Sequence, residues 1–135
     1  MVKEYKFRGY SLEDLKKMSI DELAKLFPSR IRRSLKRGLS DQQKKLLENV
    51  RKNPEKFHKT HVRDMVILPD MVGVRLGIFK GGSKPGDGSK WVNVIIDPKM
   101  IGRRLGEYSI PIGRVKHSAP GIGASKGSKH IATKT

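Results

Sequence analysis

The residues most able to do chemistry lie near the middle of the chain, where two histidines and an aspartate follow one another closely. His58 and His61 are three positions apart, so on one helical turn both rings could reach the same metal ion. Together with Asp64 they would suit a metal-dependent nuclease. Zinc sites need further ligands, however, and the chain contains no cysteine and no HExxH motif. We therefore expect no metal site, and we interpret Asp64, next to Arg63, as an ion-pair or capping group.

A glycine-rich run, KGGSKPGDGSK at residues 80–90, suggests at first a phosphate-binding loop. A Walker loop ends in Gly-Lys-Ser or Gly-Lys-Thr and continues into a helix, so that backbone amides face the phosphates. Here Gly88-Ser89-Lys90 reverses that order and leads into a run typical of a strand. No Ser, His and Asp arrangement is recognisable either. The sequence therefore indicates a protein that is not an enzyme and needs no cofactor.

The net charge indicates a different kind of function. The chain contains thirty Lys and Arg residues and thirteen Asp and Glu residues, so its formal net charge is +17. The excess of positive charge is spread along the whole chain. Such a charge is typical of a protein that binds a polyanion and releases its condensed counterions. The absence of cysteine fits a reducing cytosolic compartment, and no uncharged apolar run is long enough to span a membrane. We expect a cytoplasmic nucleic-acid-binding protein without a membrane segment.

Residues 11–53 contain start and stop signals that are typical of short helices. Three serines each stand three positions before a side chain that can reach back to the serine N–H, an arrangement called a capping box. The pairs are Ser11 with Asp14, Ser19 with Glu22, and Ser40 with Gln43. Leucines at three-to-four spacing follow these starts, Gly38 can supply a left-handed stop, and Asn53-Pro54 ends the last helix. We predict at least three short helices.

One of these helical stretches is strongly basic. Around the thin apolar stripe of Ile31 and Leu35, five cations occur within eight residues, namely Arg30, Arg32, Arg33, Lys36 and Arg37. A solvated helical face would have the same pattern. We favour a helix that contacts phosphates.

The second half predicts a sheet followed by a tail. Residues 62–68, 72–79 and 91–96 are short runs rich in β-branched and aromatic residues, which predict a three-stranded antiparallel sheet with 80–90 as a flexible cationic connection. Asp97-Pro98 marks the start of a short helix. We expect Trp91 in the core, and because aromatic residues are few, we do not expect base stacking on the sheet.

From residue 112 onward the periodicity is lost, and the chain carries cations, Gly and Ser but no acid. We expect a tail that is disordered in the free protein and orders along a nucleic acid. The predicted fold is therefore α+β in three parts. These parts are an N-terminal helical extension (1–58), an RNA-binding core (59–112) and a flexible basic tail (113–135).

Three runs in the second half together resemble one known family. They are KTHVRDMVILPDMVGVRLGIFKG at 59–81, WVNVIIDPKMIGRRLGEYSI at 91–110 and VKHSAPGIGAS at 115–125. They are similar to the small-subunit ribosomal protein nineteen family, in its archaeal and eukaryotic branch. The N-terminal block of that branch is matched by residues 7–27 and 32–47. The chain departs from the family in the longer connection at 80–90 and in Pro111, where Ser or Thr is usual.

The resemblance implies a component of the small-subunit head that binds 16S-type ribosomal RNA beside ribosomal protein thirteen, without a catalytic role. It also implies a tail that reaches towards the decoding region and the A-site transfer RNA. With the other cations of the chain, the expected rRNA contacts are Arg32, Arg33, Lys36, Arg37, Lys59, His61, Arg63, Lys80, Arg103, Arg104, Arg114, Lys116 and His117. The tail residues expected near the transfer RNA are Ser125, Lys126, Lys129 and His130.

Two other functions stay open at this point. A DNA-binding protein of architectural or regulatory type would have the same charge and short helices, although no recognition-helix motif and no dimerising heptad are present. The metal-dependent nuclease built on His58, His61 and Asp64 is the other.

Overall fold

The computed structural model describes residues 5–81 and 90–112, and these form the expected α+β fold. Helices come first along the chain and strands follow, with the change next to Phe57. The helices are α1 (Leu12–Lys17), α2 (Ile20–Leu26), α3 (Ser29–Lys36) and α4 (Asp41–Lys52). The strands are β1 (His58–Thr60), β2 (Arg75–Phe79) and β3 (Trp91–Ile95), and short 3-10 turns are η1 (Pro69–Met71), η2 (Pro98–Met100) and η3 (Leu105–Tyr108).

The predicted capping boxes are confirmed at the starts of α1, α2 and α4. In each, the serine hydroxyl accepts a hydrogen bond from the backbone N–H three residues on, and the side chain there accepts one from the serine N–H. A cap of this kind stabilises a helix by about 1 kcal/mol. That contribution matters because α1 and α2, at 6 and 7 residues, are too short to be stable alone.

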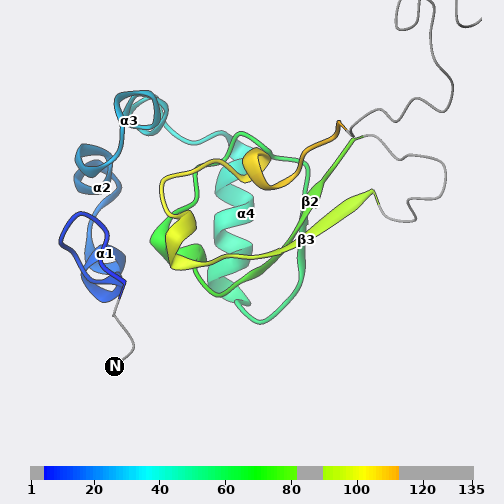
Figure 1. Ribbon diagram of the computed structural model, residues 1–135, viewed down its shortest axis with the longest axis horizontal. Helices are drawn as coiled ribbons and strands as arrows, with labels where there is room; N and C mark the ends of the chain where they lie inside the picture. Colours follow the sequence, from blue (N-terminus) through cyan, green and yellow to red (C-terminus); the bar gives the residue numbers. More distant parts are fainter. Residues whose placement is uncertain (1–4, 82–89, 113–135) are drawn as a thin grey trace, which may run out of the picture.

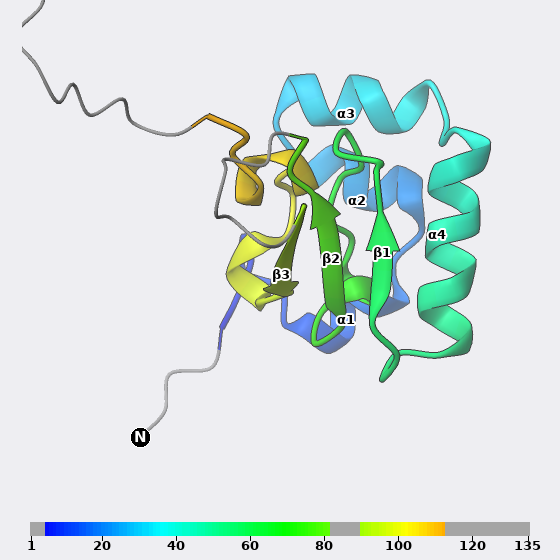
Figure 2. The ribbon, with the colours of Figure 1, turned by 90° about the vertical axis from the view of Figure 1, so that its right-hand side faces the viewer.

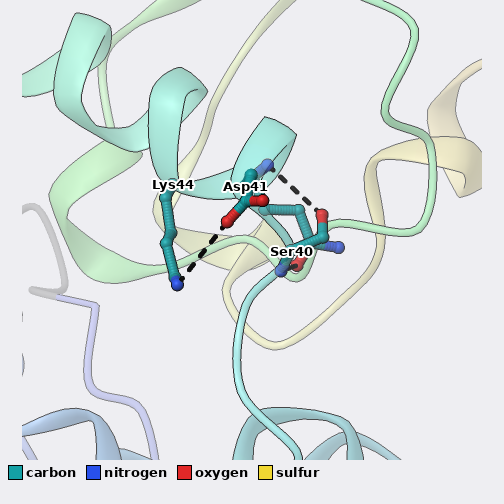
Figure 3. Close-up of polar contacts among 4 residues, drawn as sticks. Ser40, Asp41 and Lys44 are labelled. Carbon is teal, nitrogen blue, oxygen red and sulfur yellow. Dashed lines mark hydrogen bonds and ion pairs between the residues drawn. The ribbon is translucent and has the colours of Figure 1, made fainter.

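The predicted helix ends are confirmed as well. Gly38 follows α3 with a φ of 91°, in the left-handed region that glycine favours, and Asn53 ends α4. The start of α4 carries one further contact, in which Asp41 Oδ1 lies 3.8 Å from Lys44 Nζ beside Ser40 (Figure 3). Both charged side chains are exposed, so this ion pair adds little stability.

The helices and the sheet enclose a shared apolar core. Helices α1, α2 and α3 lie on one side of the molecule and strands β2 and β3 on the other (Figure 1), while α4 lies beside β1 (Figure 2). A continuous cluster of buried side chains extends from Leu15 in α1 to Leu105 in η3. The N-terminal helices therefore pack on the same core as the sheet. A domain boundary at residue 58 stays a prediction.

The sheet is mixed, so the expected antiparallel arrangement is wrong for one of its two strand pairs. β2 and β3 are antiparallel, with Phe79 opposite Trp91. β1 pairs with β2 in parallel, with Lys59 opposite Gly77. The first strand is therefore His58–Thr60, ahead of the segment in which we expected it.

Residues 62–68 are not a strand of this sheet because their backbone groups bond elsewhere. The N–H of Ile67 donates to the carbonyl of Arg103 at 2.8 Å, and the N–H of Leu105 donates to Met65 at 3.0 Å. Residues 65–69 are all buried. The continuous apolar run therefore indicated that the segment is buried, but not that it pairs as a strand. Hydrophobic periodicity alone does not distinguish a buried strand from another buried segment.

The short helix expected after Asp97-Pro98 starts there as predicted, but it is the 3-10 turn η2, and a second 3-10 turn, η3, follows it in place of one continuous helix. Gly102, between them, has a φ of 80°, which a helix does not tolerate. A Cβ atom at Gly102 would lie 2.9 Å from the Phe27 ring, so the aromatic side chain at the end of α2 needs a glycine here. Glycine at position 102 therefore meets two requirements, the left-handed backbone and the space that the Phe27 ring occupies.

No helix within residues 5–81 and 90–112 is long and apolar enough to cross a membrane.

At the ends of β2 and β3, the N–H of Lys80 donates to the carbonyl of Lys90 at 2.8 Å. Two predictions concern other residues: the expected flexible connection between these strands includes residues 82–89, and the expected disordered tail is residues 113–135. Both lie outside the residues that the structure describes.

Candidate nucleic-acid interface

Helix α3 presents most of the predicted basic stretch to solvent. Ile31 and Leu35 are buried against the core, whereas Arg33, Lys36 and Arg37 are exposed. Because opposite sides of the helix carry the apolar and the basic residues, the burial of one directs the other outward. These exposed cations form the basic face of α3, together with Arg30.

Arg32 belongs to the same stretch but has a structural role. Its guanidinium donates hydrogen bonds to the carbonyl oxygens of Ala24, Lys25 and Phe27, at 3.2, 3.3 and 3.2 Å. These carbonyls lie at the end of α2, where a cation also interacts favourably with the helix dipole. Arg32 therefore joins α3 to α2, and much of its hydrogen-bonding capacity is used inside the protein.

A cleft of about 240 Å³ opens where α3 turns into α4. Arg37 and Arg104 both line it, although they are far apart in the sequence. Nη2 of Arg104 donates to the Ser34 hydroxyl at 2.9 Å, and its Nε is buried without a hydrogen-bond partner among the described residues. On the same wall, Gln43 Nε2 donates to Asp64 Oδ2 at 3.2 Å. The cleft thus combines two guanidinium groups with one carboxylate that an amide already engages.

The two other arginines predicted to bind RNA differ in exposure. Arg103 is exposed, with Nη1 4.0 Å from Glu107 Oε2. Arg63 is half-buried, and its guanidinium donates to the carbonyl oxygens of Gly106, at 3.5 Å, and of Ser109. Arg63 therefore joins the segment between β1 and η1 to the η3 turn, while Arg103 is exposed.

The outer face of the sheet is formed by alternate residues of the three strands. Lys59, Gly77 and Asn93 lie in one row across it, and Phe79 and Trp91 lie in the next. Leu76 and Ile78 point the other way and are buried in the core. None of the three strands contains an acidic residue. We call this surface the outer sheet face.

Three aromatic rings come together at one end of the outer sheet face. The centroid of His61 lies 4.5 Å from that of Phe79 and 4.8 Å from that of Trp91, and the last two are 5.3 Å apart. Nζ of Lys59 lies 5.7 Å from the Trp91 ring, within the range of a cation–π contact. Trp91 is half-buried on this face, so its expected place in the core is wrong. Sequence reasoning missed the cluster, although strand residues on either side of a hairpin connection regularly face each other.

The histidines and aspartate considered as metal ligands have other neighbours. Nε2 of His58 is 2.8 Å from the carbonyl oxygen of Asn53, Asp64 accepts from Gln43, and His61 joins the aromatic rings. Over residues 5–81 and 90–112, no three His, Asp or Glu side chains are grouped so that they could hold a metal ion. The geometry gives the nuclease hypothesis no support.

The remaining predicted contacts are placed only in part. Lys80 is half-buried at the end of β2. The others lie outside the described residues, namely Arg114, Lys116, His117, Ser125, Lys126, Lys129 and His130.

Comparison with protein families gives a match to a range that includes most of the surfaces described above. The model of the family described as Ribosomal protein S19 matches residues 33–117. This range is more than half of the chain, and it includes the cleft lined by Arg37 and Arg104 as well as the whole sheet. Exposed cations such as those of α3 are the groups with which a protein of a ribonucleoprotein particle contacts RNA phosphates. The chain belongs to the ribosomal protein S19 family and is a ribosomal protein of the small subunit, with a role in translation.

Proposed function

We propose that this protein is a structural constituent of the small-subunit head that binds 16S-type ribosomal RNA through its basic side chains. The observation that carries the proposal is the position of the cations next to the cleft. Arg33, Lys36 and Arg37 on α3 are exposed at the same end of the fold as Arg104, within or beside the family match. Phosphate contacts of this kind fix the position of a protein on folded RNA without reading its bases.

The proposal extends to the partners and the branch of the family that the sequence resembles. The protein would lie beside ribosomal protein thirteen, with residues 113–135 reaching towards the decoding region and the A-site transfer RNA. It would work in cytoplasmic ribosomes of the archaeal and eukaryotic type. We assign it no catalytic role, because its contribution is to hold folded RNA in place.

Binding to the head domain of 16S-type rRNA, measured over a range of salt concentrations, tests the proposal. Each lost phosphate contact should make the slope of log affinity against log salt shallower by roughly 0.7 to 0.9. We therefore expect a clearly reduced slope for a Lys36→Ala, Arg37→Ala double variant. Lys16→Ala with Lys17→Ala is the matched control, since both lysines are exposed in the last turn of α1.

A duplex DNA competitor of equal phosphate content completes the experiment. The rRNA fragment should retain the protein at physiological salt, where non-specific DNA binding is weak. Equal competition by duplex DNA, or equal slopes for the two double variants, would contradict the proposal. Chemical footprinting of reconstituted subunits with and without residues 113–135 would then test the position of the tail.

A further inference from the structure

We infer that the outer sheet face carries a stacking site for an unpaired RNA base, formed by the rings of His61, Phe79 and Trp91. The inference deepens the proposed function and rests on it, because it adds a base contact to a surface otherwise described only by its charge. The three ring centroids lie 4.5 to 5.3 Å from one another, so the rings form a compact aromatic surface. Such surfaces bind bases of any sequence, since every base has a π-face.

The charge around the rings fits a nucleotide better than an apolar partner. Lys59 and Arg75 are exposed on the strands, and no strand residue is acidic. Nζ of Lys59 lies over the Trp91 ring, 5.7 Å from its centroid, so a base that stacks on that side of the ring takes the place of the ammonium group, which can then pair with the phosphate of the same nucleotide. Asn93, exposed in the neighbouring row, offers an amide for the edge of the base. Stacking, a cation and a neutral amide are the groups that single-stranded RNA recognition combines.

The rings are held in place before any ligand binds. Phe79 and Trp91 are paired across β2 and β3, and the bond from Lys80 N–H to the Lys90 carbonyl closes the pair of strands beyond them. The hydroxyl of Ser109, a fully buried residue, donates to the carbonyl of Phe79 at 3.2 Å. Because these contacts restrain the backbone at Phe79 and Trp91, less conformational entropy is lost at these two residues when a base stacks on their rings.

Trp91 is the only tryptophan of the chain, and this makes it a fluorescence reporter of the site. The full-length protein is titrated with a hexaribonucleotide of adenosines and with an abasic hexamer that has the same number of phosphates. We expect the adenosine hexamer to quench Trp91 and to bind roughly 5- to 150-fold more tightly than the abasic hexamer, which is the range for stacking one base.

Substitutions then test whether the three rings cause the preference for the adenosine hexamer over the abasic hexamer. Phe79→Leu and His61→Ala should each remove most of the preference for the base-bearing hexamer. Tyr10→Leu is the matched control, because Tyr10 is an exposed aromatic residue ahead of α1 and should keep the preference. If Phe79→Leu does not fold, His61→Ala still decides, since His61 is an exposed residue outside the core.

The outcomes separate this inference from the proposed function. Equal affinity for the two hexamers, or a preference that His61→Ala leaves intact, overturns the stacking site and leaves the surface to a protein neighbour. In that case salt-dependent binding of the 16S-type rRNA fragment would persist, so the proposed function would stand. Failure of the unaltered protein to bind the rRNA fragment at all would overturn the proposed function.

Discussion

Arg104 and Ser34, seventy positions apart in the sequence, are joined by a hydrogen bond of 2.9 Å from the guanidinium to the hydroxyl. Ser34 belongs to α3, and Arg104 immediately precedes η3. The bond therefore fixes the basic face of α3 relative to the part of the chain that follows the sheet. It also aims one edge of a guanidinium into the cleft next to Arg37.

Replacing Arg104 should lower the stability of the fold. We expect Arg104→Ala to lower the free energy of unfolding by about 1 kcal/mol, because the hydrogen bond to Ser34 is lost. Urea unfolding followed by circular dichroism measures this change. Arg103→Ala is the matched control: Arg103 is exposed and its contacts with Glu107 and Tyr108 lie at the surface, so its removal should leave stability within about 0.5 kcal/mol. Equal stability of the two variants would contradict the role of the bond.

Arg32 and Arg33 are adjacent in the sequence, yet they should behave in opposite ways. Arg32→Ala removes the donor to three carbonyls at the end of α2 and should lower the free energy of unfolding by about 1 kcal/mol. Arg33→Ala should leave stability unchanged and make the salt dependence of rRNA binding shallower by roughly 0.7 to 0.9. Denaturation and binding measured on the same two proteins would settle the point. A salt slope that changes more for Arg32→Ala than for Arg33→Ala would refute it.

Gly102 should tolerate a methyl group less well than Gly73, although both have a φ near 80–90°. The left-handed conformation alone costs an alanine roughly 1 to 2 kcal/mol. At Gly73 no atom lies within 4 Å of the added Cβ, whereas at Gly102 the ring of the fully buried Phe27 lies 2.9 Å away. Gly102→Ala should therefore lose about 1 to 3 kcal/mol more than Gly73→Ala, because the tightly packed ring has no space to move into. Thermal unfolding of the two variants provides the comparison.

The capping boxes predict how stability depends on pH in acid. Hydrogen bonds from the Ser11 hydroxyl and N–H lower the pKa of Asp14 from its ordinary value of 3.8, and hydrogen bonds from the Ser19 N–H and hydroxyl lower that of Glu22 from 4.5. A carboxyl whose pKa is lower in the folded state stabilises the fold above its unfolded pKa. That stabilisation is lost as the pH falls below these ordinary values and through the folded ones.

A Ser11→Ala, Ser19→Ala double variant should therefore be less stable than the parent at neutral pH, and the difference should shrink below about pH 4. Melting temperatures of the two proteins between pH 7 and pH 2.5 measure the effect. A constant difference in melting temperature over that range would mean that the serine contacts do not depend on the charge of the carboxylates.

Local signals in the sequence predicted the helical half well. A serine and the acceptor three residues later can form a capping box without help from the rest of the chain, so Ser11, Ser19 and Ser40 each marked a true helix start. Gly38 and Asn53 marked true ends for the same reason. Each of these features depends on a few neighbouring residues only.

Signals in the other half were ambiguous because they depend on distant partners. The backbone of the run at 62–68 is hydrogen-bonded to residues 102–106, a partner that the sequence does not indicate, and β1 has only three residues with no marked strand pattern. Arg32 was predicted as an RNA contact from its charge and Arg63 from the resemblance to the family, and neither signal revealed that both side chains donate to backbone carbonyls inside the fold. The aromatic cluster was missed because Phe79 and Trp91 lie on either side of a long connection and His61 follows a different strand.

The parallel pairing of β1 with β2 has a consequence for how the protein is made. A parallel pair cannot be joined by a tight turn, and here residues 61–74 must first run back through the apolar core before β2 can add to β1. Forming that long-range contact is slow compared with forming the capped helices, whose contacts are local. Pulse-labelling hydrogen exchange should therefore show protection in α4 before β1. On the translating ribosome, the helices would therefore leave the exit tunnel and fold before the strands that follow them can pair.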